Sequence, residues 1–214
     1  IGTQISEALL QHRVCARSEA RRSAIELLRQ VRIPDPERRV DEYPHRLSGG
    51  MRQRVMIAIA IAGRPKLLIA DEPTTALDVT VEAQIMGLIA GLQRDLHLGV
   101  LLITHNLGLV RRWAQQVAVM YAGRIVELGT VTEVLRRPAH PYTRALLAAR
   151  PGAGTGRLED IPGVVPAPGE IVNGCAFAPR CRFAEAACRA TTPSLREITP
   201  ARRAACDRIE SIGF

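Results

Sequence analysis

The sequence is nearly devoid of lysine and poor in aromatic residues. Of its 29 basic residues only Lys66 is a lysine, and no stretch fits the phosphate-binding pattern G-x-x-x-x-G-K-[ST]. Aromatic residues make up only 3% of the chain, so platforms for stacking nucleic-acid bases are scarce despite a net charge of +8. No apolar run approaches the roughly 18 residues of a membrane span. These absences argue against a nucleic-acid-binding protein and against a membrane-spanning segment in this sequence.

Short apolar runs alternate with helical patterns along most of the chain. Helices are expected over residues 5–14, 18–31 (with Ser18 as its cap), 49–62, 79–96, 107–115 and 131–137, the last opened by a Thr130–Glu133 capping box. Strands are expected over 67–70, 100–104, 117–120 and 124–127, the first of them buried and the last two joined by a hairpin at Ala122-Gly123. This alternation favours an α/β fold with a mostly parallel core sheet.

The composition changes after Arg150. Residues 151–174 hold ten glycines or prolines in 24 positions, which predicts a linker without regular structure, and four of the five cysteines follow it. We therefore expect three parts: a helical subdomain over residues 1–64, an α/β core over 65–150, and a linker with a cysteine module over 151–214.

Ser48-Gly49-Gly50 opens the helix expected over residues 49–62. A helix N-terminus offers unpaired N–H groups and a partial positive charge, glycines let a phosphate approach the backbone, and the Ser48 hydroxyl adds a donor. The simpler alternative is an ordinary serine-capped helix. Taken alone, this segment favours the simpler alternative.

Charged and polar groups also follow two of the expected strands. Asp71 and Glu72 come directly after one strand, and His105 follows another. An open α/β sheet places its ligands at the carboxyl ends of its strands, where Asp71 could hold Mg²⁺ and Glu72 could polarise an attacking water. A pair of solvated turn acids and an ordinary loop histidine are the alternatives.

Order and spacing decide between these alternatives. Leu47-Ser48-Gly49-Gly50-Met51-Arg52-Gln53-Arg54, then Leu67-Leu68-Ile69-Ala70-Asp71-Glu72-Pro73, then Thr74-Thr75-Ala76-Leu77-Asp78 and finally His105 resemble the signature, Walker B, D-loop and H-loop motifs of ATP-binding cassette (ABC) ATPases. The resemblance implies that Glu72 and His105 are catalytic, that Asp71 binds Mg²⁺, and that nucleotide is contacted by Ser48, Gly49, Gly50, Gln53, Asp71 and Asp78. The family usually has aspartate after the histidine, where this chain has Asn106.

Two further segments narrow the family. His140-Pro141-Tyr142-Thr143-Arg144-Ala145-Leu146-Leu147 and Gly174-Cys175-Ala176-Phe177-Ala178-Pro179-Arg180-Cys181 resemble the region after the nucleotide-binding domain in ATPases of oligopeptide and dipeptide importers. The resemblance implies a P-loop NTPase fold, ATP and Mg²⁺ as ligands, and a peripheral position on the cytoplasmic face of the membrane. It also implies a second ABC ATPase subunit, two membrane-spanning permease subunits and, indirectly, an extracytoplasmic substrate-binding protein as partners, with no nucleic acid.

The clustered cysteines have the spacing C-x₅-C-x₆-C-x₁₇-C. Structural zinc sites usually contain a close C-x₂₋₄-C pair, which is absent, whereas the ligands of an iron–sulfur cluster need only converge in space. Zinc, free thiols and disulfides stay open as alternatives. The family resemblance implies a [4Fe–4S] cluster held by Cys175, Cys181, Cys188 and Cys206.

The sequence begins without methionine and lacks the phosphate-binding lysine of such ATPases. We expect that lysine before Ile1, so that these 214 residues are a fragment that hydrolyses no ATP alone. The rival hypotheses are a catalytically silent remnant and an iron–sulfur binding module.

Overall fold

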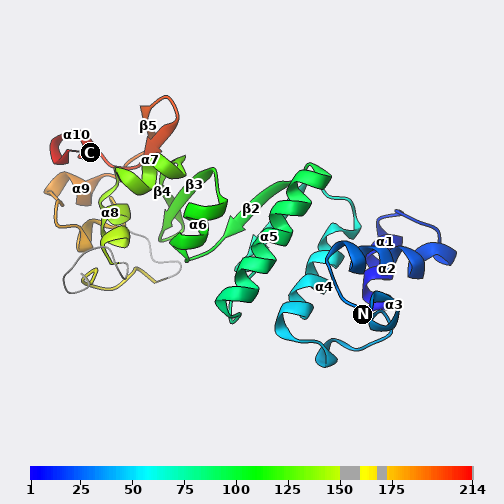
Figure 1. Cartoon of the computed structure of the whole chain (residues 1–214). Helices are drawn as coiled ribbons and strands as arrows, with labels where there is room; N and C mark the ends of the chain where they lie inside the picture. Colours follow the sequence, from blue (N-terminus) through cyan, green and yellow to red (C-terminus); the bar gives the residue numbers. More distant parts are fainter. Residues whose placement is uncertain (150–159, 168–172, 214) are drawn as a thin grey trace. The chain divides into compact units, whose positions relative to one another are not determined.

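The computed structural model describes residues 1–149, 160–167 and 173–213, which form two compact units, residues 1–106 and 107–214 (Figure 1). The expected three-part division with boundaries at 64 and 150 stays a prediction. Most of the expected linker lies outside the described residues. No helix in the described ranges is both long and apolar enough to span a membrane.

Helices open the first unit. α1 (Gly2–Gln11) packs against α2 (Ala20–Gln30), both contact α4 (Gly49–Ala62), and the short α3 (Pro36–Arg39) contacts α2. Their shared core is made by the fully buried side chains Ile5, Ala24, Leu28 and Ala58. Each buried leucine or isoleucine contributes about 1.5–3 kcal/mol to folding, so this apolar face holds the helices together. The predicted cap at Ser18 is wrong, because a 3₁₀ turn over Arg17–Glu19 precedes α2 and no side chain caps that helix.

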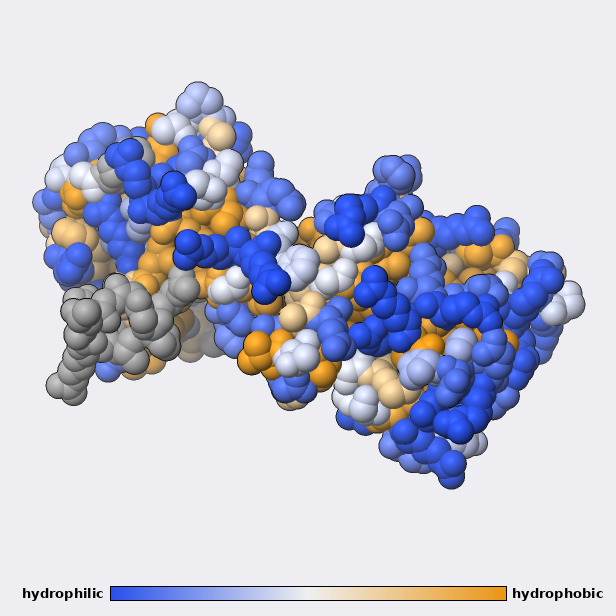
Figure 2. Space-filling model, in the orientation of Figure 1, coloured by the Kyte–Doolittle hydropathy of each residue, from blue (hydrophilic) through white to orange (hydrophobic). Residues whose placement is uncertain are grey.

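The surface of these helices is rich in arginine. Ion pairs such as Arg21–Asp41 (2.7 Å) and Arg22–Glu19 (3.0 Å) are exposed. The face shown in Figure 2 is accordingly mostly hydrophilic over this helical part. Exposed pairs contribute only about 0–1 kcal/mol each, so the apolar core and not the charge pattern stabilises this subdomain.

The rest of the first unit is the strand–helix–strand segment that places the candidate site. β1 (Leu67–Asp71) leads to α5 (Val79–Leu96), which returns to β2 (Gly99–Ile103), and the two strands pair in parallel from Leu67↔Gly99 to Asp71↔Ile103. The bounds observed for α4 and α5 confirm those expected from the sequence. Because the strands are parallel and in this register, their carboxyl ends meet at one edge.

The predicted full burial of the strand over residues 67–70 is wrong. Leu68 and Ala70 are buried, but Leu67 and Ile69 are about half exposed, as are Leu101 and Ile103 on β2. Alternate side chains of a strand point to opposite faces, and in the described residues only one face of this two-stranded sheet is covered. An unbroken run of apolar residues does not distinguish a strand buried on both faces from one buried on a single face.

The second unit is built on an antiparallel sheet. α6 (Leu107–Trp113) precedes β3 (Gln116–Tyr121) and β4 (Arg124–Thr130), and the hairpin between these strands turns at Ala122-Gly123 with positive φ at both residues, as a type I′ turn requires. The predicted N-cap at Thr130 is confirmed, since its hydroxyl accepts from the Glu133 N–H at the start of α7 (Val131–Arg136) and donates to the Glu133 carboxylate. α8 (Pro141–Ala148) follows.

Two strands that the sequence pattern did not reveal complete this sheet. β5 (Arg196–Thr199) and β6 (Arg202–Ala204) join it in the order β3-β4-β6-β5, and all pairings are antiparallel. The short helices α9 (Ala186–Ala190) and α10 (Ile209–Ile212) flank them. The expected parallel pairing of core strands therefore holds for β1 and β2, and the antiparallel pairing of β3 with β4 is that of the expected hairpin. β5 and β6 are too short to show a hydrophobic period.

A buried ion pair fastens β6 to β4. Glu127 and Arg202 are almost completely buried, and Arg202 donates to Glu127 Oε1 from Nε (3.2 Å) and from a terminal nitrogen (2.5 Å). The Glu127 carboxyl group also accepts from the backbone N–H groups of Ala139 and His140, at 2.9 Å each. One buried carboxyl group thus ties the segment between α7 and α8 to two strands.

Candidate functional site

The carboxyl ends of β1 and β2 bring Glu72 and His105 into direct contact. His105 Nδ1 lies 2.8 Å from Glu72 Oε1, although 33 residues separate them in the sequence. Thr75, three residues after Glu72, donates its hydroxyl to the other carboxylate oxygen at 2.7 Å. Both oxygens of the Glu72 carboxylate are therefore held, Oε1 by His105 in the loop after β2 and Oε2 by Thr75 in the loop after β1.

These hydrogen bonds stabilise the ionised form of Glu72. The bond to His105, followed by the bond to Thr75, lowers the pKa of this carboxyl group below its usual value. The side chain is substantially exposed. An exposed, ionised carboxylate with a fixed orientation is suited to accept a proton from a water molecule or to orient it.

The backbone at Glu72 is held in an uncommon conformation. Its φ is +44°, in the left-handed region that non-glycine residues seldom adopt, and its N–H donates to the Ile103 carbonyl at 2.9 Å. This bond extends the β1–β2 ladder by one residue and turns the side chain toward His105. Asp71, the last residue of β1, is exposed at the same edge, where its carboxylate offers the hard oxygen ligand that Mg²⁺ prefers.

Ser48, Gly49 and Gly50 form the start of α4, as the sequence predicted. Ser48 is the N-cap and accepts from the Met51 N–H at 3.3 Å. A Cβ atom on Gly50 would lie 2.6 Å from a methyl group of Val81, so the start of α4 packs tightly against the start of α5. The glycine is required by this close approach, in addition to any use for ligand binding.

Asp78 caps α5 by accepting from the Val81 N–H at 2.9 Å. Gln53 lies half buried in the second turn of α4. The structure therefore gives both Ser48 and Asp78 a role in capping the start of a helix, and their contacts with nucleotide stay predictions. The sequence reasoning overlooked Thr75, whose position three residues after Glu72 in a tight turn was the available signal.

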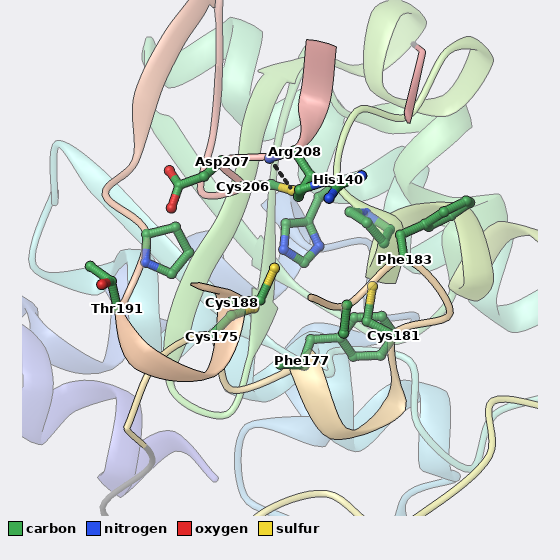
Figure 3. A pocket seen from close by; sticks show the side chains of 14 residues that line it. His140, Cys175, Phe177, Cys181, Phe183, Cys188, Thr191, Cys206, Asp207 and Arg208 are labelled. Carbon is green, nitrogen blue, oxygen red and sulfur yellow. Dashed lines mark hydrogen bonds between the residues drawn. The ribbon is translucent and has the colours of Figure 1, made fainter. Parts of the chain in front are cut away.

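The four clustered cysteines line one pocket in the second unit, together with His140 and Phe177 (Figure 3). They reach it from separate places: Cys175 and Cys181 flank a 3₁₀ turn, Cys188 lies on α9, and Cys206 follows β6. Gly174 makes this convergence possible, because its φ is +78° and a Cβ atom there would lie 2.5 Å from the carbonyl oxygen of Cys188.

Burial favours the protonated form of three of these thiols, those of Cys175, Cys181 and Cys206. It raises the pKa of Cys206 to about 11, and it also raises the pKa values of Cys175 and Cys181, with a smaller contribution from the neighbouring thiols. Their mutual influence shows that these sulfur atoms lie within electrostatic range of one another. A bound cation would instead favour the deprotonated thiolates, because thiolates are the form that binds metals.

His140 lines the pocket without being available as a ligand through Nδ1. That nitrogen accepts from the Tyr142 N–H at 3.1 Å and so caps α8, and burial, the largest effect, lowers the pKa of the ring to about 4. Within the described part of the chain, no three His, Cys, Asp or Glu side chains are grouped as ligands of a metal ion. The pocket is thus a convergence of thiols without a preformed single-ion site.

Two family models match the chain. "ABC transporter" matches residues 2–75, and "Oligopeptide/dipeptide transporter, C-terminal region" matches residues 126–188. A relative in Sinorhizobium fredii, named "Probable peptide ABC transporter ATP-binding protein", is 54% identical over 99% of this chain and 64% of its own length. The chain spans 62–65% of the length of this and other curated relatives that it matches.

Solved structures share the fold. cbiO1 of Clostridium perfringens, part of an ABC transporter complex, is 32% identical with a TM-score of 0.51 and covers 57% of this chain and 48% of its own. MJ0796, a bacterial ABC transporter cassette solved as a dimer, is 27% identical with a TM-score of 0.50 and covers 60% of this chain and 56% of its own. The α/β fold is thus that of ABC ATPase cassettes. We conclude that the chain carries an ABC transporter ATP-binding segment followed by the oligopeptide/dipeptide transporter C-terminal region, and that it is similar along nearly its whole length to relatives named as peptide ABC transporter ATP-binding proteins.

Proposed function

We propose that the chain serves in the ATP-hydrolysing subunit of a peptide-type ABC importer, within a protein that also carries a P-loop. The observation that carries this proposal is the hydrogen-bonded pair of Glu72 and His105 beside Asp71, at the carboxyl ends of two parallel strands. Open α/β sheets bind their ligands at this edge. The names of the relatives support peptide import in particular.

Each residue at the edge has a distinct task in this proposal. Asp71 binds Mg²⁺, which neutralises charge on the phosphates of ATP when bound. Glu72 orients the attacking water and accepts its proton. His105 fixes the Glu72 carboxylate through Nδ1 and uses its exposed ring to contact the γ-phosphate.

We further propose a head-to-tail pair with a second ABC ATPase subunit. Ser48, Gly49, Gly50 and Gln53 would face ATP bound by the partner, and Asp78 would lie along the subunit interface. Two permease subunits would receive the motion, with a substrate-binding protein acting indirectly, at the cytoplasmic face of the membrane. In support, Ser48 and the N-terminus of α4 are accessible, and that helix end carries the partial positive charge that favours phosphate.

The role of Glu72 is tested by Glu72→Gln in a protein that includes a P-loop. The amide keeps the shape but cannot accept a proton, so kcat should fall on the order of 10²-fold or more while ATP affinity is kept. Steady-state hydrolysis and equilibrium binding of ATP measure the two effects. Glu197→Gln, an exposed change on β5, is the matched control. Turnover close to that of the control would reject Glu72 as the base.

We also propose that Cys175, Cys181, Cys188 and Cys206 hold a [4Fe–4S] cluster. The support is that all four line one pocket whose other walls include Phe177 and Phe183. A cluster is wider than a single ion, so its thiolates need not approach as closely as the ligands of one zinc. These soft donors fit such a group, which serves here as a covalent tie between loops.

Metal analysis after anaerobic purification tests this assignment. Serine at any of the four positions removes a soft ligand and should discharge the iron and sulfide, with loss of the visible absorption. Cys15→Ser is the control, since Cys15 lies in the other unit and outside the pocket. A colourless protein with one zinc would replace the cluster by a zinc site, and a metal-free protein with an ordered tail would remove both.

A further inference from the structure

Glu82, on the first turn of α5, lies between the two loops that carry Glu72 and His105. Its Oε2 accepts from the Thr74 hydroxyl at 3.3 Å and from the Asn106 side-chain amide at 3.5 Å. Thr74 follows Glu72 by two residues, and Asn106 directly follows His105. Oε2 of Glu82 therefore contacts both the loop that carries Glu72 and the loop that carries His105.

The loop that carries Glu72 needs such support. Glu72 and Ala76 have positive φ (+44° and +62°), a conformation that persists only where surrounding contacts impose it. Thr74 is buried, which fixes its hydroxyl beside Glu82. On the other loop, the Asn106 N–H donates to the Thr104 hydroxyl at 3.0 Å, so its backbone is also held.

The chemistry of the contact is directional. A carboxylate at position 82 can only accept hydrogen bonds, so it needs a donor at position 106, which the Asn106 amide supplies. Aspartate at 106 would place a second acceptor of the same charge against Glu82, and the two would repel. Exchanging the two groups, with glutamine at 82 and aspartate at 106, restores one donor and one acceptor without changing the net charge.

We propose that Glu82 and Asn106 form a carboxylate–amide pair that, together with Thr74, positions His105 against Glu72. Both members are positioning residues, because Asn106 adjoins His105 along the chain and Glu82 contacts Thr74, two residues after Glu72. The contact joins groups of this chain alone. Its purpose in hydrolysis rests on the proposed function of the Glu72–His105 pair.

The contact is tested first in the 214-residue chain, without nucleotide. The imidazole ¹⁵N shifts of His105 report the hydrogen bond at Nδ1. Asn106→Asp should move them toward the values of a solvent-exposed histidine, and adding Glu82→Gln should return them to the wild-type values. Asn173→Asp makes the same chemical change at an exposed position of the other unit and should leave them unaltered. Wild-type shifts in Asn106→Asp, or no rescue in the double variant, would overturn the proposal.

The second measurement uses a protein that includes a P-loop. Asn106→Asp should lower kcat roughly 10-fold, a fraction of the 10²-fold that misplaced groups can cost, with ATP affinity kept. The double variant Glu82→Gln with Asn106→Asp should recover most of the lost kcat. Full activity in Asn106→Asp, despite displaced His105 signals, would remove the catalytic purpose and with it the proposal. If the shifts respond as described but the wild-type protein hydrolyses nothing, the proposed function fails while the contact stands.

Discussion

Glu127 shows how a single residue can organise a region that sequence patterns describe poorly. Its carboxyl group is fully buried and accepts from Arg202 and from two backbone N–H groups in the segment between α7 and α8. Arg202 also donates to the Arg137 carbonyl. Removing one member of such a pair costs more than the pair contributes, because the other is left buried without its partner.

We predict that Glu127→Ala destabilises the chain by about 3–5 kcal/mol. The variant removes the acceptor of Arg202, Ala139 and His140 at once. Urea denaturation of the 214-residue chain measures the change. Glu197→Ala, at an exposed position of β5, should alter stability by less than about 0.5 kcal/mol. A loss of less than about 1 kcal/mol in Glu127→Ala would contradict the importance of this buried contact.

At the scale of elements, the starts of α4 and α5 depend on each other. Ser48 caps α4 and Asp78 caps α5, and the two helix starts meet where Gly50 packs against Val81. The preceding glycine is less constrained, since a Cβ atom on Gly49 would lie 3.3 Å from the end of the Leu77 side chain. The two neighbouring glycines of this motif are therefore constrained to different degrees: a side chain at position 50 would clash with Val81, whereas one at position 49 would meet only the end of Leu77.

Alanine substitutions at positions 49 and 50 should therefore have different effects on stability. Gly50→Ala should cost about 1–3 kcal/mol, because its methyl group overlaps Val81 and pushes the helices apart. Gly49→Ala should change stability by less than about 1 kcal/mol, because the Leu77 side chain can move and alanine favours the helix. Thermal or urea unfolding of both variants gives the comparison. Equal costs at the two positions would disprove the tight contact at Gly50.

At the scale of the whole molecule, the chain consists of two compact units with different sheets. The first carries the parallel strands and the Glu72–His105 pair, and the second carries the antiparallel sheet and the cysteine pocket. Because the chain spans 62–65% of its curated relatives, activity is a property to be measured in a protein that includes the P-loop.

The proposed head-to-tail pairing makes a prediction at this scale. Ser48→Arg places a long side chain at the start of α4 and should reduce hydrolysis roughly 10²-fold at the site whose P-loop belongs to the partner. Mixed dimers with one Ser48→Arg subunit and one Glu72→Gln subunit distinguish the arrangements. If both changes disable the same nucleotide site, half of the activity remains, whereas two disabled sites would show that α4 serves ATP bound by its own subunit.

The amino-acid sequence by itself determined the local elements and the identity of the chemical groups. The bounds of α4 and α5, the hairpin at Ala122-Gly123 and the N-cap at Thr130 all follow from short-range periodicity, turn chemistry and capping, which act within a few residues. The nucleotide-binding motifs were recognisable for the same reason, since their residues follow one another along the chain.

Only the tertiary structure decided which distant groups meet. Glu72 and His105, 33 residues apart in the sequence, meet because β1 and β2 pair in parallel. Glu127 and Arg202 meet because β6 joins the second sheet beside β4. β5 and β6 could not be read from the sequence, because three or four residues carry no periodic signal and such strands exist only when paired. The convergence of the four cysteines likewise depends on Gly174 and on contacts between loops, whose energies are set by the fold and not by spacing.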